Sequence, residues 1–306
     1  MKSVLPTLAL TAALPFSLAG CVVVDSQGHI TREEKRFTVT GAPDLRLVTF
    51  DGAIEIRSGD AKTVVVEIEK RGPTKESTEE LKVETKQDGD RIEVEVKKPA
   101  HEVVVFGIGV GHMSPTAKLI VTMPRDGNVT ARSGDGSIKI EHVHGRLELK
   151  TGDGSIRATD IAGQLTLSTG DGSVTLEDVG GDLDVDTGDG SVSVAGKLGT
   201  VKLHTGDGSI TFRAAAGTSM KDDWSMTTGD GGVALYLPSD FGAELDAHTG
   251  DGSIRNELGV KAEAEADSDR DRDRERDRRT LKGKLGAGGK LLRIRTGDGS
   301  IRLKTS

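Results

Sequence analysis

Residues 165–194 read LTLSTGDGSVTLEDVGGDLDVDTGDGSVSV and contain the repeat that decides the fold. A turn of the form Thr/Ser-Gly-Asp-Gly-Ser/Gly-Ile/Val occurs eight times between Gly134 and Ser300. A fixed short period indicates one structural unit that stacks on copies of itself, because each copy needs its neighbours to cover an apolar face. In the first five copies the turn aspartates follow one another every 18 residues, at Asp135, Asp153, Asp171, Asp189 and Asp207.

Apolar residues flank the turns at fixed positions, six and four before the aspartate and three and five after it, with Asn256 as the exception in the copy around Asp251. This period of two predicts a β-strand on either side of a tight turn. The same positions remain apolar around Asp230 and Asp298, where the spacing between copies changes, so the length changes fall in loops. Around Asp171 the four residues are Leu165, Leu167, Val174 and Leu176.

We predict an all-β fold, a right-handed parallel β-solenoid with 18-residue coils. The alternative is an antiparallel β-meander, because Asp-Gly between alternating apolar residues is also a hairpin signal. The solenoid is favoured because it brings two apolar strand faces together and covers both, whereas a single meandering sheet leaves one face bare. The expected hand follows from the right-handedness of crossovers between parallel strands.

A degraded form of the same template occurs nearer the N-terminus. One copy is centred on Asp51-Gly52, and a looser one with a longer turn runs through Asp88-Gly89. We therefore assign residues 36–306 to one solenoid domain, which has an irregular half at 36–125 and regular repeats at 126–306.

A highly charged segment interrupts the last repeats. Residues 261–279 read KAEAEADSDRDRDRERDRR and contain no large apolar side chain. Such a segment has nothing to bury, so it predicts a disordered, solvated insertion that leaves the stack before the last coil.

The N-terminus has the features of a secretory signal followed by a lipid attachment site. Residues 1–20 contain Lys2 and an apolar stretch, which is typical of a cleaved signal peptide. Leu18-Ala19-Gly20-Cys21 resembles the lipobox of bacterial lipoproteins, and Cys21 is the only cysteine of the chain. We predict that Cys21 becomes the lipidated N-terminus and that residues 21–35 form a tether. Val22 is not the Asp associated with inner-membrane retention, so the resemblance implies the outer membrane if the host has two membranes.

The charge of the chain limits its partners. The net charge is −8, and it becomes −9 when residues 1–20, whose one charged side chain is Lys2, are removed. An acidic chain is a poor match for nucleic acid. With a single cysteine the chain forms no internal disulfide. The expected partners are the membrane, through the lipid anchor, and an envelope protein or polysaccharide.

The turn aspartates have two possible roles. In the structural one, glycine on both sides allows neighbouring coils to pass closely, and Asp and Ser side chains satisfy backbone N–H groups at the corner. In the alternative, the chain is a calcium-binding module similar to a β-roll, because carboxylates are the hard oxygen ligands that calcium prefers. A β-roll needs a Gly-Gly-x-Gly-x-Asp segment on every half-coil, and the opposite corners lack it. We therefore expect no cofactor; the calcium alternative would use Asp135, Asp153, Asp171, Asp189 and Asp207.

Other candidate sites carry weaker signals. His142 and His144 alternate on one strand face and are interpreted as solvated side chains and not as a zinc site. No residue stands out as a nucleophile with a base beside it, so we expect no enzymatic activity. A polysaccharide-active enzyme on a β-solenoid is the minor alternative.

The chain resembles the bacterial putative-adhesin or toast-rack β-strand-repeat family over about residues 36–306. The features that carry the resemblance are the degraded N-terminal copy, the intermediate strands and the Gly-Asp-Gly-Ser-Ile turns between short Leu-x-Leu strands. The resemblance implies an extracytoplasmic β-solenoid linked to the cell envelope and its stress responses, and it supplies no catalytic residue. The charged insertion departs from the family pattern. We therefore predict a non-catalytic lipoprotein of the bacterial cell envelope, an adhesin-like structural or interaction module.

Overall fold

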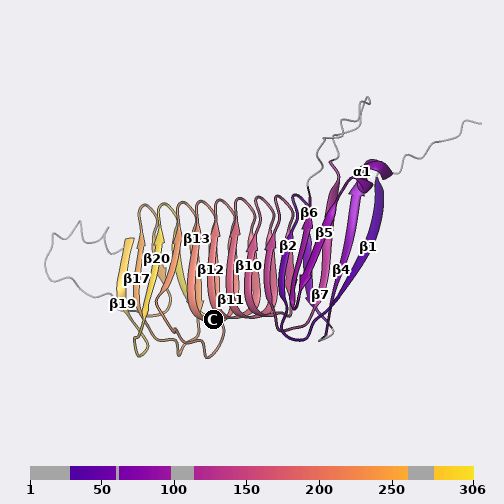
Figure 1. Ribbon diagram of the computed structural model, residues 1–306. Helices are drawn as coiled ribbons and strands as arrows, with labels where there is room; N and C mark the ends of the chain where they lie inside the picture. Colours follow the sequence, from indigo (N-terminus) through magenta and orange to yellow (C-terminus); the bar gives the residue numbers. More distant parts are fainter. Residues whose placement is uncertain (1–27, 60–61, 98–113, 261–278) are drawn as a thin grey trace, which may run out of the picture.

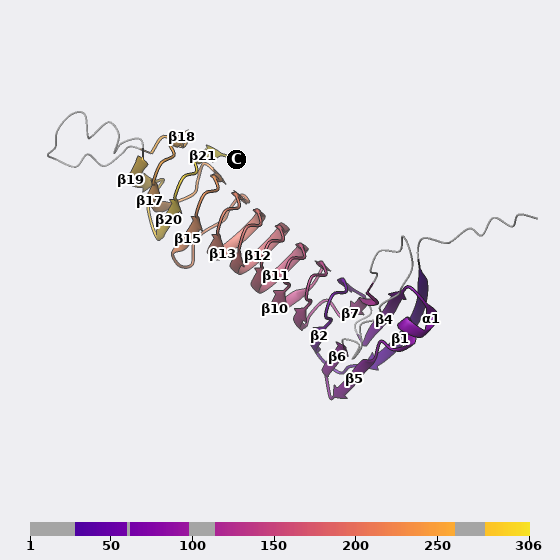
Figure 2. The ribbon, with the colours of Figure 1, turned by 90° about the horizontal axis from the view of Figure 1, so that it is seen from above.

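The computed structural model describes residues 28–59, 62–97, 114–260 and 279–306. Within these ranges the chain consists of β-strands and one short helix, α1 (Lys75–Glu79). Figures 1 and 2 show the strands stacked side by side along one long axis, so the body is a rod. The prediction of an all-β fold is confirmed. Residues 1–20, Cys21 and the insertion 261–279, apart from Arg279, lie outside the described residues.

The regular repeats form parallel coils. Strand β12 pairs in parallel with β11 and with β13, and the register places Leu165 beside Leu183 and Leu183 beside Val201. Equivalent positions of successive coils therefore stack 18 residues apart, which confirms the parallel solenoid and shows that the antiparallel meander is wrong for these repeats. The strands are β8 (Asn128–Arg132), β9 (Ile138–Glu141), β10 (His144–Lys150), β11 (Ile156–Thr169), β12 (Val174–Thr187), β13 (Val192–Thr205) and β14 (Ile210–Ala214).

Each long strand passes round a corner opposite the Gly-Asp-Gly turn. In β11 this corner contains Asp160 and Gly163, whose φ angles are 52° and 129°. Positive φ is accessible to glycine and, less readily, to Asp. The first half of β11 pairs with β9 and its second half with β10. Strands that follow a turn therefore form one face of the rod, and strands that precede a turn form the other.

The core between the two faces is mainly aliphatic. Leu165, Leu167 and Leu176 are each 1% exposed, as the apolar positions of the repeat predict. Burying such a side chain contributes about 1.5–3 kcal/mol, so the stack gains stability with each coil. The large aromatic residues gather near the C-terminal end, where the Trp224 ring lies 5.2 Å from that of Phe212 and 5.4 Å from that of Phe241.

The order of coils at the C-terminal end differs from the order of the sequence. Strand β20 pairs in parallel with both β15 and β17, and β21 pairs in parallel with both β16 and β18. The coil around Asp298, which is last in the sequence, is therefore inserted between the coils around Asp230 and Asp251. The strands are β15 (Trp224–Thr228), β16 (Val233–Leu237), β17 (Ala243–Thr249), β18 (Ile254–Asn256), β19 (Thr280–Leu285), β20 (Leu291–Thr296) and β21 (Ile301–Thr305).

The N-terminal end repeats this arrangement. Strand β2 lies between β6 and β8, and β3 lies between β7 and β9, so the coil around Asp51 is also one place inside the end of the stack. Beyond it, β4 pairs antiparallel with both β1 and β7. The strands are β1 (His29–Thr38), β2 (Asp44–Val48), β3 (Ile54–Ser58), β4 (Thr63–Gly72), β5 (Val83–Asp88), β6 (Arg91–Val96) and β7 (Thr116–Met123).

Two predictions for the irregular half were wrong in detail. The copy through Asp88-Gly89 is an antiparallel hairpin of β5 and β6, because Asp-Gly there makes the hairpin turn that this dipeptide also favours. The domain begins at His29 and not at residue 36, so residues 29–35 of the predicted tether belong to β1. Since β1 is a charged, mostly exposed edge strand, its sequence shows little apolar alternation.

Candidate functional site

The Gly-Asp-Gly turns lie above one another along one edge of the rod. Their backbones are joined from coil to coil: the Gly188 N–H donates to Gly170 O at 2.7 Å, and the Gly206 N–H donates to Gly188 O at 2.5 Å. A Cβ atom on Gly172 would lie 2.1 Å from Gly154 O, so glycine is required for this close approach. The edge is therefore a continuous hydrogen-bonded ladder of backbone.

A buried hydroxyl side chain beneath each turn provides the side-chain contacts; it is Ser133 in the first turn and threonine in the other seven. The Thr205 hydroxyl lies 3.2 Å from Gly188 O and 2.9 Å from Gly190 O, and it accepts a hydrogen bond from the Gly208 N–H at 3.2 Å. One hydroxyl thus connects its own turn to the turn of the preceding coil. The same position is occupied by Thr151, Thr169, Thr187, Thr228, Thr249 and Thr296.

The turn aspartates themselves are exposed. In the described ranges, the five side chains of the predicted row make no hydrogen bond or ion pair, whereas Asp251 lies 3.5 Å from the Arg279 guanidinium. The corner N–H groups are therefore satisfied by threonine and backbone, and the predicted capping by Asp side chains is wrong. Nor do three or more His, Cys, Asp or Glu side chains converge on a possible metal position anywhere in the described residues. The exposed row comprises Asp135, Asp153, Asp171, Asp189 and Asp207.

The opposite corner holds a compact group of charged side chains. Asp160 Oδ2 lies 2.8 Å from His142 Nδ1 and 2.9 Å from Arg125 Nη2. The pKa of Asp160 lies below its usual value because His142 hydrogen-bonds its carboxylate and the Arg125 guanidinium lies beside it. His144 Nε2 accepts a hydrogen bond from Arg125 Nε at 3.1 Å. His142 and His144 are thus tied into this corner, and they are not isolated strand side chains.

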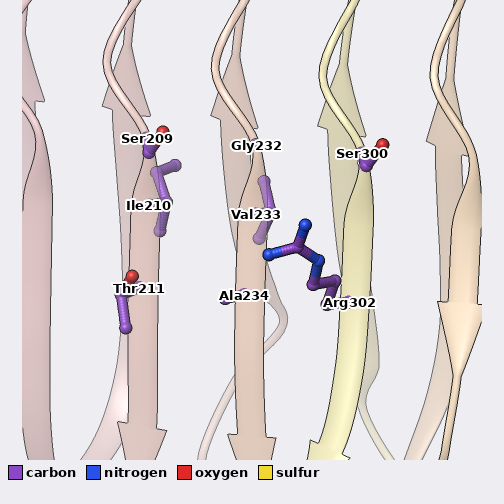
Figure 3. A pocket seen from close by; sticks show the side chains of 8 residues that line it. All are labelled: Ser209, Ile210, Thr211, Gly232, Val233, Ala234, Ser300 and Arg302. Carbon is purple, nitrogen blue, oxygen red and sulfur yellow. The ribbon is translucent and has the colours of Figure 1, made fainter.

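A notch interrupts the outer face formed by β14, β16 and β21 (Figure 3). Its floor is β16, where Gly232 and Ala234 stand at positions that carry Ser209 and Thr211 in the preceding coil. The notch encloses about 450 Å³. Figure 3 shows the Arg302 side chain reaching from β21 toward β16. Its lining also includes three hydroxyl side chains, those of Ser209, Thr211 and Ser300, and the strand residues Ile210 and Val233.

Sequence reasoning missed the notch for a topological reason. Gly232 and Ala234 are visible in the sequence as small residues in the repeat. Arg302, however, becomes the neighbour of Ala234 only because the last coil is inserted next to β16.

The described residues contain no helix that is long and apolar enough to span a membrane.

Comparisons with known proteins agree with the fold. The family model Toastrack DUF4097 matches residues 44–304. Similar solved structures include a putative adhesin from Bacteroides fragilis, with 11% identity and a TM-score of 0.42, covering 89% of this chain and 97% of that chain. Another is a putative cell adhesion protein from Clostridium sporogenes, with 14% identity and a TM-score of 0.30, covering 91% of this chain and 100% of that chain. At such low similarity, nothing about the ligand of this chain is drawn from them. No curated protein matches the chain.

Proposed function

Because the chain belongs to the Toastrack DUF4097 family, we propose that it is a non-catalytic lipoprotein of the cell envelope, an adhesin-like structural or interaction module. The observation that carries this proposal is the short sequence separation between Cys21 and the first strand of the rod. Strand β1 begins at His29, eight residues after Cys21, and eight residues span at most about 29 Å. A lipid on Cys21 would therefore hold the N-terminal end of a rigid rod close to a membrane.

The character of the exposed surface supports a binding or spacing role over catalysis. The turn aspartates lie on an open edge that water reaches freely, and catalytic sites usually exclude water from the reacting groups. The notch at Gly232 is likewise shallow and open (Figure 3). A long body with repeated exposed side chains suits the presentation or recognition of an extended partner. In a host with two membranes, Val22 favours the outer membrane, and the family resemblance favours a link to envelope stress.

The anchoring proposal is tested by substituting Cys21. Cys21→Ser should remove lipid labelling and release the protein from the membrane fraction. Val22→Asp is the matched control, since it keeps the acceptor cysteine and should remain lipidated. Unchanged lipid labelling and membrane association of the Cys21→Ser protein would refute the proposal.

Calcium binding is the second candidate, and the exposed, unpaired carboxylates of the turn row favour it. Successive turns place carboxylates on adjacent coils, where a cation would relieve their mutual repulsion. Calorimetry with calcium separates the two candidates. Stoichiometric binding that is lost in the double variant Asp171→Asn, Asp189→Asn would establish an ion-binding module, whereas its absence would leave the turn row with a structural role.

A further inference from the structure

We propose that the notch at Gly232 and Ala234 binds an acidic sugar residue of a polysaccharide, with Arg302 as the anion-binding side chain and Arg255, on the next strand, adding positive charge beside it. The inference rests on the proposed function, because it names the partner of the same envelope module. It is supported by the shape of the notch, by the charge of the surrounding surface and by the lack of a polar partner for Arg302 or Arg255 among the residues that the structure describes.

The shape of the notch follows from two small residues, Gly232 and Ala234, which lie between longer side chains. Along the register, Thr211 lies beside Ala234, Ala234 beside Arg302, and Arg302 beside Arg255. Ala234 leaves an outward gap between Thr211 and Arg302, and Gly232 deepens it toward the turn. The gap crosses the strands, so a linear chain can lie in it along the axis of the rod.

The charge of this surface is opposite to that of the whole chain. The outward side chains of β14, β16, β21 and the neighbouring β18 segment include four cationic groups and one carboxylate, although the net charge of the chain is −8. The carboxylate, Glu257, lies 3.8 Å from Lys304 and is therefore engaged. Arg213 lies over the Tyr236 ring, with its Cζ 4.5 Å from the ring centroid. The cationic groups are Arg213, Arg255, Arg302 and Lys304.

Arg302 and Arg255 have no partner of their own. Both are exposed, and neither forms a hydrogen bond or ion pair within the described ranges. They lie at paired positions on adjacent parallel strands, where like charges repel. An anion bound in the notch beside Arg302 reduces this repulsion, and a planar carboxylate can accept two parallel hydrogen bonds from a guanidinium.

The hydroxyl lining indicates a sugar more than an anionic membrane. Ser209, Thr211 and Ser300 can exchange hydrogen bonds with sugar hydroxyls next to the carboxylate. A flat anionic membrane would also meet the exposed turn aspartates of the same coils, Asp230, Asp251 and Asp298. A single polysaccharide chain can follow the basic strip and avoid them, so a uronate chain is the better match.

The test is calorimetric titration of the purified full chain with a galacturonate oligosaccharide at low and high salt. Binding should be absent for a neutral glucose oligosaccharide of equal length and should weaken with salt. Arg302→Gln should weaken binding roughly 10-fold or more, because it removes charge-assisted hydrogen bonds. Ala234→Gln should also weaken it, because the longer side chain fills the notch without changing the charge.

Arg157→Gln is the matched control. Arg157 is exposed at the equivalent position of the coil around Asp153 and forms no ion pair with any described residue, but it is remote from the notch. Equal weakening by Arg157→Gln would reveal general electrostatic attraction and overturn the proposal. Two other results would overturn the proposal. One is that inorganic sulfate competes for the site as well as the oligosaccharide does. The other is that the protein binds anionic vesicles through Arg302 but does not bind the oligosaccharide. If the oligosaccharide does not bind at all, the sugar proposal is wrong, but membrane association through Cys21 is unaffected. The two proposals can therefore fail separately.

Discussion

At the residue scale, the threonine that precedes seven of the eight Gly-Asp-Gly turns matters more for stability than the aspartate. Thr205 is fully buried, and its hydroxyl contacts three backbone groups on two coils. Thr205→Val should therefore destabilise the protein by about 1–3 kcal/mol, because it leaves buried polar groups without a partner. Denaturant unfolding measures the loss. Asp207→Asn is the comparison and should change stability by no more than about 0.5 kcal/mol; the reverse ranking would contradict this assignment.

Asp160 should make stability depend on pH at acidic values. Its pKa is lowered in the folded state, so its stabilising effect is present above the unfolded value of 3.8 and is lost as the pH falls through the lower folded value. Asp160→Asn keeps a side chain that tolerates the positive φ but removes the charge. The melting temperature of this variant should be lower than that of the native protein at neutral pH, and the gap should narrow as the pH falls below 3.8.

Asp178 provides the control for that titration. It has nearly the same φ angle, 53°, at the same corner of the next coil, and its side chain forms no ion pair or hydrogen bond within the described ranges. Asp178→Asn should leave the melting temperature unchanged across the same pH range. A pH-dependent gap as large as that of Asp160→Asn would show that the His142 and Arg125 contacts are not the cause.

At the element scale, the spacing between coils is set by glycine at the turns. Gly172→Ala should cost about 1–3 kcal/mol or more, because its Cβ would lie 2.1 Å from the Gly154 carbonyl oxygen and the coils would have to separate. Gly180→Ala, on the same coil, meets its nearest atom at 3.5 Å and should be tolerated. Thermal melting of both variants checks the contrast, and equal destabilisation would mean that propensity and not close approach explains the effect.

The regular coils were predictable from sequence because their signal is local. Leu165 and Leu167 before the turn and Val174 and Leu176 after it define two strands without reference to any other part of the chain. The charged edge strand β1 could not be identified in this way, because its pairing with β4 depends on backbone hydrogen bonds more than on apolar alternation. The hairpin at Asp88-Gly89 was misassigned since the same dipeptide serves both kinds of turn.

At the scale of the whole molecule, local sequence patterns do not predict that the terminal coils are inserted one place inside each end of the stack. Nothing in residues 291–305 specifies whether they stack beyond β17 and β18 or before them, because they carry the same apolar pattern as the other clean coils; Asn256, in the coil around Asp251, is the one departure from that pattern. The insertion places Arg302 beside Ala234 and so creates the notch. The turn row was visible in the sequence, whereas the basic strip depends on this long-range order.

The most direct test of the account is therefore the order of the coils, measured by disulfide formation in double-cysteine variants made in a Cys21→Ser background. Ala234→Cys with Arg302→Cys joins adjacent strands, about 4.8 Å apart, within the range that a disulfide spans. Ala234→Cys with Arg255→Cys joins strands separated by β21, about 9.6 Å apart and out of reach. We predict rapid intramolecular oxidation of the first pair and none of the second. Oxidation of the second pair but not the first would show that the coils follow sequence order, and the inserted coil and the notch would both be wrong.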